Sequence, residues 1–403
     1  MVSFKHEKIF VTSIFSLFFI FIFLFIFVPE TQQSSIFFRQ TQDYMMDYHN
    51  VINYSANLDP YQYNDIAYID QSARTERIYP PLAYLIFYLL GKGAHFVNVN
   101  LTMNLFMLFC SFFLFFTLYE GYYGKKIYRI AIISALMCSS IFLFSYERGN
   151  IIILVAACCA FFIFNFCSED KIIKEIALIA LAFATALKIS PALLGLLLLF
   201  EKRWKEAFRV TIYGAVLAFL PFIFFDGSFR NICTLITNVG IFNRHYEFAH
   251  VPRFNFRYWA PAFLYIPPIF TIFKYTIFPY FEIVLGFFAV ATAYFHKERW
   301  KQIMQLLLVF SVLMINSFQY TGLYMFAGII LFFNSDKHSR FDGWFTLLFI
   351  LLLNPLRIII PVNIGVIDLS TMLMNLSASI MLIILTTQST IPTLKFIKSK
   401  MHS

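Results

Sequence analysis

Apolar windows of helical length recur along nearly the whole chain, separated by short charged segments, and this pattern constrains the fold more than any motif. A run of about 20 apolar residues is long enough to cross the hydrocarbon core of a bilayer as a helix. Hydrophobic residues make up 60% of the 403 residues, only 13% are charged, and the mean hydropathy is +0.72. Soluble domains are far less apolar. The sequence therefore predicts an all-α, polytopic integral membrane protein.

The windows predict about twelve transmembrane helices. We treat residues 1–403 as a single membrane domain, because no soluble domain, low-complexity tract or internal repeat is evident. The first helix is expected to be retained, since polar residues follow it instead of a small-residue cleavage site. The predicted spans are residues 9–28, 98–119, 128–145, 150–167, 172–188, 190–200, 207–225, 276–295, 303–317, 319–334, 342–360 and 367–387.

Orientation follows from the Lys and Arg residues, because positively charged short loops stay in the cytoplasm. Most of these residues share one side if both termini are cytoplasmic. Pro80–Lys92 is too short to span and is predicted to be a juxtamembrane helix at the outer surface, which its Pro pair suits as a helix start. Two long segments then face outward: residues 29–97, with short juxtamembrane helices, and residues 226–275.

The first outer loop carries two aspartates that are four residues apart, Asp43 and Asp47, in a stretch that reads as a short helix. This spacing places both carboxylates on one face, with Asn50 and Tyr54 close by. Asp47 stands between methionine and aromatic residues, in a partly buried setting where a carboxylate can serve as a general base. The alternative is a solvated helix face with an N-cap.

Two cations stand out among the apolar spans. Arg148 lies in Glu147-Arg148-Gly149-Asn150 at the same outer face, and Lys188 lies in an apolar stretch with no acidic residue close in sequence. A lysine near the membrane centre costs about 2.5 to 3.5 kcal/mol on insertion scales. Snorkelling reduces this cost, and so would an anionic ligand such as a lipid phosphate.

Other residues carry weaker signals. Arg244, His245 and Arg253 lie among aromatic residues in the second outer segment, where either substrate contacts or ordinary surface roles are open. The six cysteines have no metal-ligand spacing, and no phosphate-cradling Gly-rich loop, Ser/His/Asp set or zinc signature is present. We therefore predict no metal and no cofactor. The basic loops are explained by topology, so nucleic-acid binding is not predicted.

Taken in order, the landmarks resemble glycosyltransferase family 87 of the GT-C superfamily. They are an outer-loop Asp after the first span, Asp59-Pro60-Tyr61, Tyr79-Pro80-Pro81-Leu82, Glu147-Arg148-Gly149-Asn150, and Leu187-Lys188-Ile189-Ser190-Pro191 followed by Arg203-Trp204. They cover roughly the first 205 residues. Beyond them the match is one of hydropathy and of a loosely similar segment, Asn316-Ser317-Phe318-Gln319-Tyr320, where no histidine or tryptophan is available for substrate contacts.

The resemblance implies an inverting glycosyltransferase that moves a mannose-like hexose or a pentose from a polyprenyl-monophosphate donor. The acceptor would be a glycolipid or glycan at the extracytoplasmic face of a membrane, such as the bacterial inner membrane. Asp47, with Asp43 as its rival, would be the base, and Arg148 and Lys188 would bind the donor phosphate. Substrate-binding residues would be His49, Asn50, Tyr79, Asn150, Arg244, His245, Arg253 and Tyr320. A flippase or a polymerase of lipid-linked glycans is the alternative function.

Overall fold

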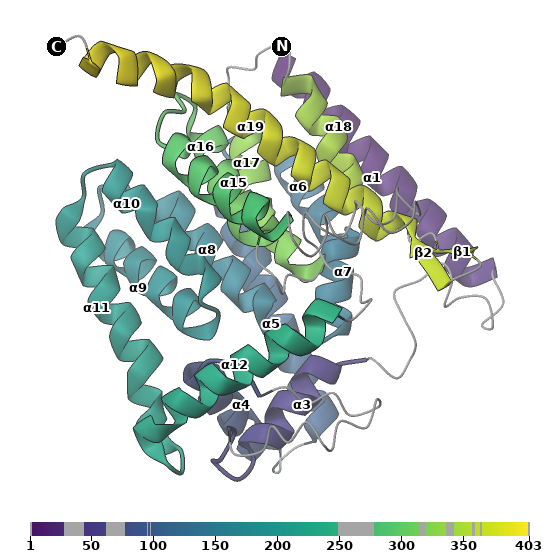
Figure 1. The fold of residues 1–403 in the computed structure, drawn as a ribbon. Helices are drawn as coiled ribbons and strands as arrows, with labels where there is room; N and C mark the ends of the chain where they lie inside the picture. Colours follow the sequence, from purple (N-terminus) through teal and green to yellow (C-terminus); the bar gives the residue numbers. More distant parts are fainter. Residues whose placement is uncertain are drawn as a thin grey trace. The chain divides into compact units, whose positions relative to one another are not determined.

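The protein was analysed as a computed structural model, which describes residues 2–27, 44–61, 77–94, 96, 98–248, 278–313, 319–335, 342–356, 359–362 and 365–401. These residues are almost entirely helical, with one two-stranded antiparallel hairpin (Figure 1). The structure confirms the predicted helical class.

Each predicted span contains a helix, and the helices begin and end within several residues of most predicted bounds. In the windows 190–200, 207–225 and 319–334, a short 3-10 helix (η) precedes or follows the α-helix. The elements are α1 (Val2–Phe27), α3 (Met46–Ser55), α4 (Pro81–Ala94), α5 (Val99–Gly121), α6 (Lys126–Met137), α7 (Ser140–Glu147), α8 (Ile152–Asn165), α9 (Lys171–Leu187), η3 (Ser190–Gly195), α10 (Leu196–Phe200), α11 (Trp204–Phe219), η4 (Leu220–Phe224), η5 (Ser228–Arg230), α12 (Asn231–Phe248), α15 (Phe278–Ala293), α16 (Arg299–Val312), η7 (Gln319–Tyr324), α17 (Met325–Phe333), α18 (Asp342–Leu353), β1 (Ile359–Val362), β2 (Gly365–Asp368) and α19 (Leu369–Met401).

Four helices in the described ranges are long and apolar enough to cross a membrane: His6–Phe27, Val99–Gly121, Trp204–Phe224 and Leu369–Phe396. A fifth candidate is the pair α6 and α7, which is bent by 54°. Six further apolar helices are shorter. Large side chains such as Phe19 (66% exposed) and Phe109 (61% exposed) cover these helices, which suits contact with lipid rather than water. The structure therefore supports a membrane protein but does not confirm twelve spans.

Three sequence predictions need correction. The window 342–360 is not one helix, because α18 ends at Leu353 and β1 then pairs with β2 in the register Ile359 opposite Asp368. The window 128–145 divides into α6 and α7. The second outer segment, for which no helix was predicted, contains α12.

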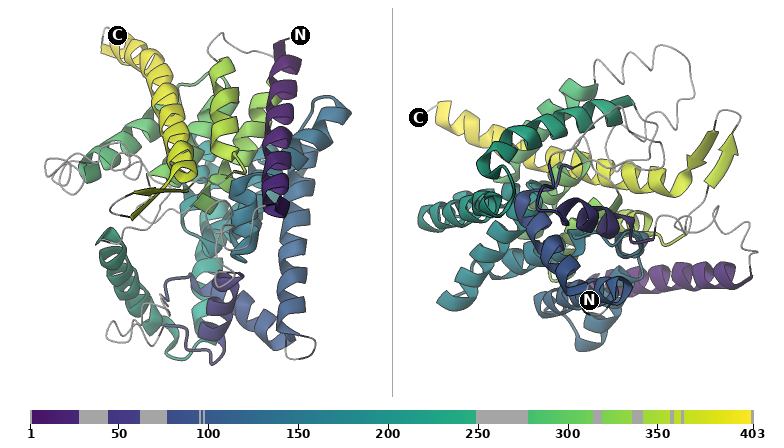
Figure 2. Two further views of the ribbon diagram at one scale, coloured as in Figure 1. Left: turned by 90° about the vertical axis from the view of Figure 1, so that its right-hand side faces the viewer. Right: turned by 90° about the horizontal axis from the view of Figure 1, so that it is seen from below.

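The chain divides into two compact units that are interleaved along the sequence. One contains residues 1–40, 117–144 and 252–403, and the other contains residues 41–116 and 145–251. In the first unit, α19 follows directly on the hairpin (Figure 2) and packs against α15, α16 and α18. A buried Gln305 links α16 to α15 by donating to the Ala289 carbonyl oxygen (2.6 Å) and to the Thr292 hydroxyl (3.1 Å).

The second unit is built on α9, which packs between α8 and α11 (Figure 1). Asp170 caps the start of α9 by accepting from the backbone N–H groups of Ile172 (2.7 Å) and Ile173 (3.2 Å). The short helix α3 packs on α4, with the buried Tyr48 ring edge-on to Phe87 at 5.3 Å between ring centroids. In turn α4 packs on α9, so these two helices of the first loop lie against this bundle.

Candidate active site

A tight turn between α7 and α8 carries two residues of the site, Arg148 and Asn150. Its backbone closes through two hydrogen bonds, from Gly149 N–H to the Tyr146 carbonyl (2.9 Å) and from Asn150 N–H to the Ser145 carbonyl (3.1 Å). Gly149 has φ +63°, the left-handed region that favours glycine. The Asn150 side-chain oxygen accepts from Ile152 N–H at 3.0 Å where α8 begins. The turn is thus fixed at both ends.

The start of α3 is hydrogen-bonded to this turn through the backbone. Met45 N–H donates to the Glu147 carbonyl (2.6 Å), and Asp47 N–H donates to the Arg148 carbonyl (3.0 Å). Met45 itself has φ 53°, a conformation that a non-glycine side chain rarely adopts. The approach is so close that a Cβ on Gly149 would lie 2.9 Å from Tyr48 Cβ. The backbone contacts therefore set the position of Asp47.

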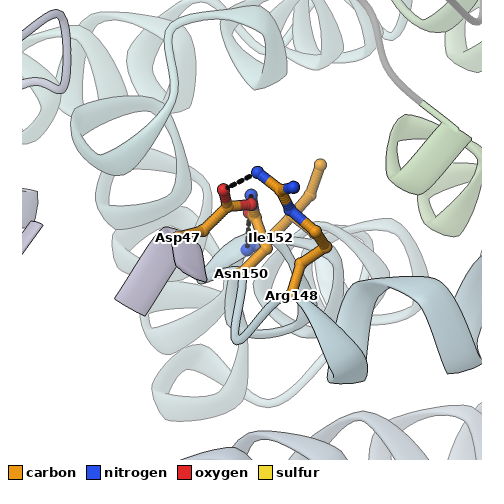
Figure 3. Close-up of polar contacts among 4 residues, drawn as sticks. All are labelled: Asp47, Arg148, Asn150 and Ile152. Carbon is orange, nitrogen blue, oxygen red and sulfur yellow. Dashed lines mark hydrogen bonds and ion pairs between the residues drawn. The ribbon is translucent and has the colours of Figure 1, made fainter. Parts of the chain in front are cut away.

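Asp47, Arg148 and Asn150 form one polar cluster, shown in Figure 3. The Arg148 guanidinium pairs with Asp47 Oδ1, and Asn150 Nδ2 donates to Asp47 Oδ2 at 2.7 Å. The Asp47 and Arg148 side chains are only 14% and 18% exposed, and Asn150 is 1% exposed. Charge-assisted hydrogen bonds of this kind, partly shielded from water, are stronger than neutral ones. Arg148 and Asn150 thus both bind the Asp47 carboxylate, which lies about a hundred positions before them in the sequence.

Lys188 lies in the same unit, just after the end of α9, where its N–H donates to the Ala184 carbonyl (2.9 Å). Its ammonium nitrogen is 5.4 Å from the centroid of the Tyr79 ring, within the range of a cation–π interaction. Asp47 acts electrostatically on the same ammonium. The site therefore combines one carboxylate with two cations, and Tyr79 holds one of them.

Several supporting residues were not predicted from the sequence. The Tyr61 hydroxyl donates to the Tyr79 carbonyl (3.0 Å), which fixes the chain just before α4. Arg77 donates to the Asp59 carbonyl (3.3 Å) and lies over the Tyr54 ring at 5.0 Å. On α12, the buried Asn238 donates to the Arg77 carbonyl at 3.1 Å. Only the Asp59-Pro60-Tyr61 and Tyr79-Pro80 landmarks gave a signal for this network.

The remaining predicted residues are not joined to the cluster by a described contact. His49 and Asn50 are partly exposed on α3, and the His49 ring is edge-on to Tyr48. Asp43 and Arg253 lie outside the described residues. Arg244 and His245 belong to α12, where only their backbone is described. Tyr320 is in the other unit, where its ring stacks on Phe144 with a centroid distance of 6.2 Å.

Tyr48 is adjacent to Asp47, but burial raises the pKa of its phenol to about 12. Tyr48 therefore stays protonated near neutral pH and does not serve as the base. The carboxylate of Asp47 is the candidate base of the cluster. Within the described ranges, no three His, Cys, Asp or Glu residues are grouped so that they could hold a metal ion. A reaction without a metal stays a prediction.

Comparison with known proteins agrees with the family that the sequence landmarks resemble. The search of curated proteins found no match. A family model for glycosyltransferase family 87 matches residues 78–317, which is more than half of the chain. The matched range includes Tyr79, Arg148, Asn150 and Lys188 but begins after Asp47 and after Asp59-Pro60-Tyr61. It extends well beyond residue 205, where the sequence landmarks ended. The chain therefore belongs to glycosyltransferase family 87.

Proposed function

We propose that this membrane glycosyltransferase transfers a sugar from a polyprenyl-monophosphate donor, with inversion, to a glycolipid or glycan acceptor at the extracytoplasmic face. The observation that carries the proposal is the Asp47 carboxylate, held by Arg148 and Asn150, with Lys188 within electrostatic reach. A carboxylate beside two cations suits a reaction that removes a proton at one point and stabilises a leaving phosphate at another. Family membership favours this reaction over the flippase and the polymerase.

In the proposed step, Asp47 accepts the proton of an acceptor hydroxyl while that oxygen attacks the anomeric carbon of the donor sugar. The new bond joins the acceptor oxygen to the anomeric carbon, and the bond from that carbon to the phosphate oxygen breaks. Its electron pair leaves with the polyprenyl phosphate. A single displacement inverts the anomeric centre. Arg148 and Lys188 stabilise the negative charge that grows on the departing phosphate.

Asp47 is our candidate base, with Asp43 as the rival. Two features support Asp47: its backbone N–H is anchored to the Arg148 carbonyl, and both of its carboxylate oxygens are hydrogen-bonded. Reactive groups need this kind of fixed geometry, since a small misplacement lowers the rate strongly. The sugar is a mannose-like hexose or a pentose by family resemblance. His49, Asn50, Tyr79, Arg244, His245, Arg253 and Tyr320 are proposed to contact the substrates.

The test is sugar transfer by purified protein in detergent or vesicles. A panel of polyprenyl-phosphate hexoses and pentoses is incubated with the protein and membrane glycolipids, and the labelled product and its anomeric configuration are determined. We expect Asp47→Asn to lower the turnover number by about 10² to 10⁴, because a positioned base contributes that much.

Asp43→Asn is the matched control for this test, and it should keep most of the wild-type turnover. The reverse pattern would assign the base to Asp43. A retained anomeric configuration would overturn direct displacement. Glycolipid movement across vesicles without sugar transfer would favour the flippase.

A further inference from the structure

Two residues hold the Asp47 carboxylate, and they differ in how firmly they are fixed. Asn150 is buried, and its side-chain oxygen is already committed to Ile152 N–H at 3.0 Å. Its amide nitrogen must therefore be the group that donates to Asp47 Oδ2, at 2.7 Å. The neighbouring backbone hydrogen bond to the Ser145 carbonyl further restricts this side chain. Asn150 thus holds the carboxylate from a rigid position.

Arg148 is held differently. Its guanidinium stands at the end of a long side chain with several rotatable bonds, and that side chain is 18% exposed. Guanidinium groups bind phosphate with the same paired N–H geometry that they use for carboxylate. A donor phosphate that enters the site therefore competes with Asp47 for Arg148.

From this contrast we propose that Asn150 is a positioning residue: it keeps the Asp47 carboxylate in place when Arg148 moves from that carboxylate to the donor phosphate. The inference rests on the proposed function and adds two points to it. Asn150, which the family resemblance placed among the substrate-binding residues, is proposed to act on the base instead, and Arg148 is exchanged between two anions during each turnover. In the resting site Arg148 occupies Oδ1 of the base, and phosphate binding frees that oxygen to accept the hydroxyl proton.

The first experiment substitutes Asn150 in two ways. Asn150→Asp keeps the oxygen that accepts from Ile152 N–H but removes the donor to Asp47, whereas Asn150→Ala removes both. We expect both variants to lower kcat by about 10- to 100-fold, because the carboxylate loses its fixed orientation. The donor KM of Asn150→Ala should stay within about two-fold of wild type, as a residue that does not bind the donor requires.

Thermal unfolding separates this role from a structural one. Turnover is compared per folded molecule, because Asn150→Asp retains the acceptor for Ile152 N–H but also puts a second carboxylate against Asp47, which lowers the unfolding temperature. Wild-type turnover in Asn150→Asp would overturn the positioning role. A raised donor KM with unchanged kcat in Asn150→Ala would overturn it as well, because Asn150 would then bind substrate directly.

The second experiment tests the exchange of Arg148 and needs no sugar transfer. Its probe is polyprenyl phosphate without sugar, titrated into purified protein in detergent. Removing the competing carboxylate with Asp47→Asn should tighten binding by about 5- to 30-fold, the effect of releasing a contact of one to two kcal/mol. The matched control is Asp226→Asn, which removes an equal charge from an exposed residue of the same unit and should bind as wild type does.

The outcomes separate this inference from the proposed function. Equal or weaker phosphate binding in Asp47→Asn overturns the exchange, because Asp47 would then support Arg148 rather than compete for it. Tightening of the same size in Asp226→Asn also overturns it, since net charge alone would then be responsible. Absence of sugar transfer by the wild-type protein overturns the proposed function, whatever the phosphate binding shows.

Discussion

At the scale of single residues, Gly149 carries the tightest constraint on the site. A Cβ at this position would lie 2.8 Å from Met45 Sδ, 2.9 Å from Tyr48 Cβ and 3.3 Å from Met45 Cα, at a φ of +63°. Gly149→Ala should therefore destabilise the protein by about 1 to 3 kcal/mol and push α3 away from the turn. Because Asp47 would move with α3, sugar transfer should fall as well. Thermal unfolding and turnover of the purified variant measure both effects.

The control is Gly214→Ala in α11, where no atom lies within 4 Å of the added Cβ. Alanine is favoured over glycine inside a helix by about 0.5 to 1 kcal/mol, so this variant should be as stable as wild type or more so. If Gly149→Ala is as stable and as active as Gly214→Ala, then α3 does not pack closely on the turn.

The sequence pointed to some of these residues and not to others. Arg148 and Asn150 were found through the family resemblance, which includes Glu147-Arg148-Gly149-Asn150, and Lys188 also because it is a lone cation in an apolar stretch. Met45 gave no signal, since methionine has no preference for positive φ. The pairing of Asp47 with Arg148 joins residues about a hundred positions apart, and no local pattern encodes such a contact.

At the scale of elements, hydropathy located helices well where apolar runs end at charged loops, as for α5 and α9. It missed α12 because that helix is rich in Asn and Thr and has little hydrophobic periodicity. It also extended α18 through residue 360, since apolar residues resume at Leu356 and residues 358–360, directly after the Asn354-Pro355 pair at which the helix ends. Apolar runs alone do not separate a buried strand from the end of a helix.

The start of α9 gives a prediction for an element. Asp170 accepts from two backbone N–H groups there, so Asp170→Ala should lower the unfolding free energy by about 1 kcal/mol. The loss should appear as a lower melting temperature followed by helical circular dichroism. Turnover per folded molecule should be unchanged, because the cap lies at the opposite end of α9 from Lys188. Asp170→Asn, which still caps, should melt as wild type does, and an equal loss in both variants would contradict the capping role.

At the scale of the whole molecule, the predicted topology can be tested with the protein's own cysteines. Cys233 on α12 is exposed, whereas Cys110, Cys158 and Cys159 are buried. If the positive-inside assignment is right, residues 226–275 face outward. A membrane-impermeant maleimide applied to intact cells should then label the protein at Cys233, and Cys233→Ser should abolish this labelling.

The opposite face needs its own reporter. Tyr123 is 71% exposed and lies next to the basic residues Lys125 and Lys126, which are predicted to be cytoplasmic. Cys138 and Cys167 are partly exposed, so they are replaced by Ser together with Cys233. Tyr123→Cys in this background should react only after the membrane is permeabilised. The predicted topology would be wrong if this variant were labelled in intact cells while Cys233 of the wild-type protein reacted only after permeabilisation. Asp47 would then lie on the cytoplasmic side, because the loop of residues 29–97 is predicted to share its face with residue 233. A donor presented outside the cell could not reach it there.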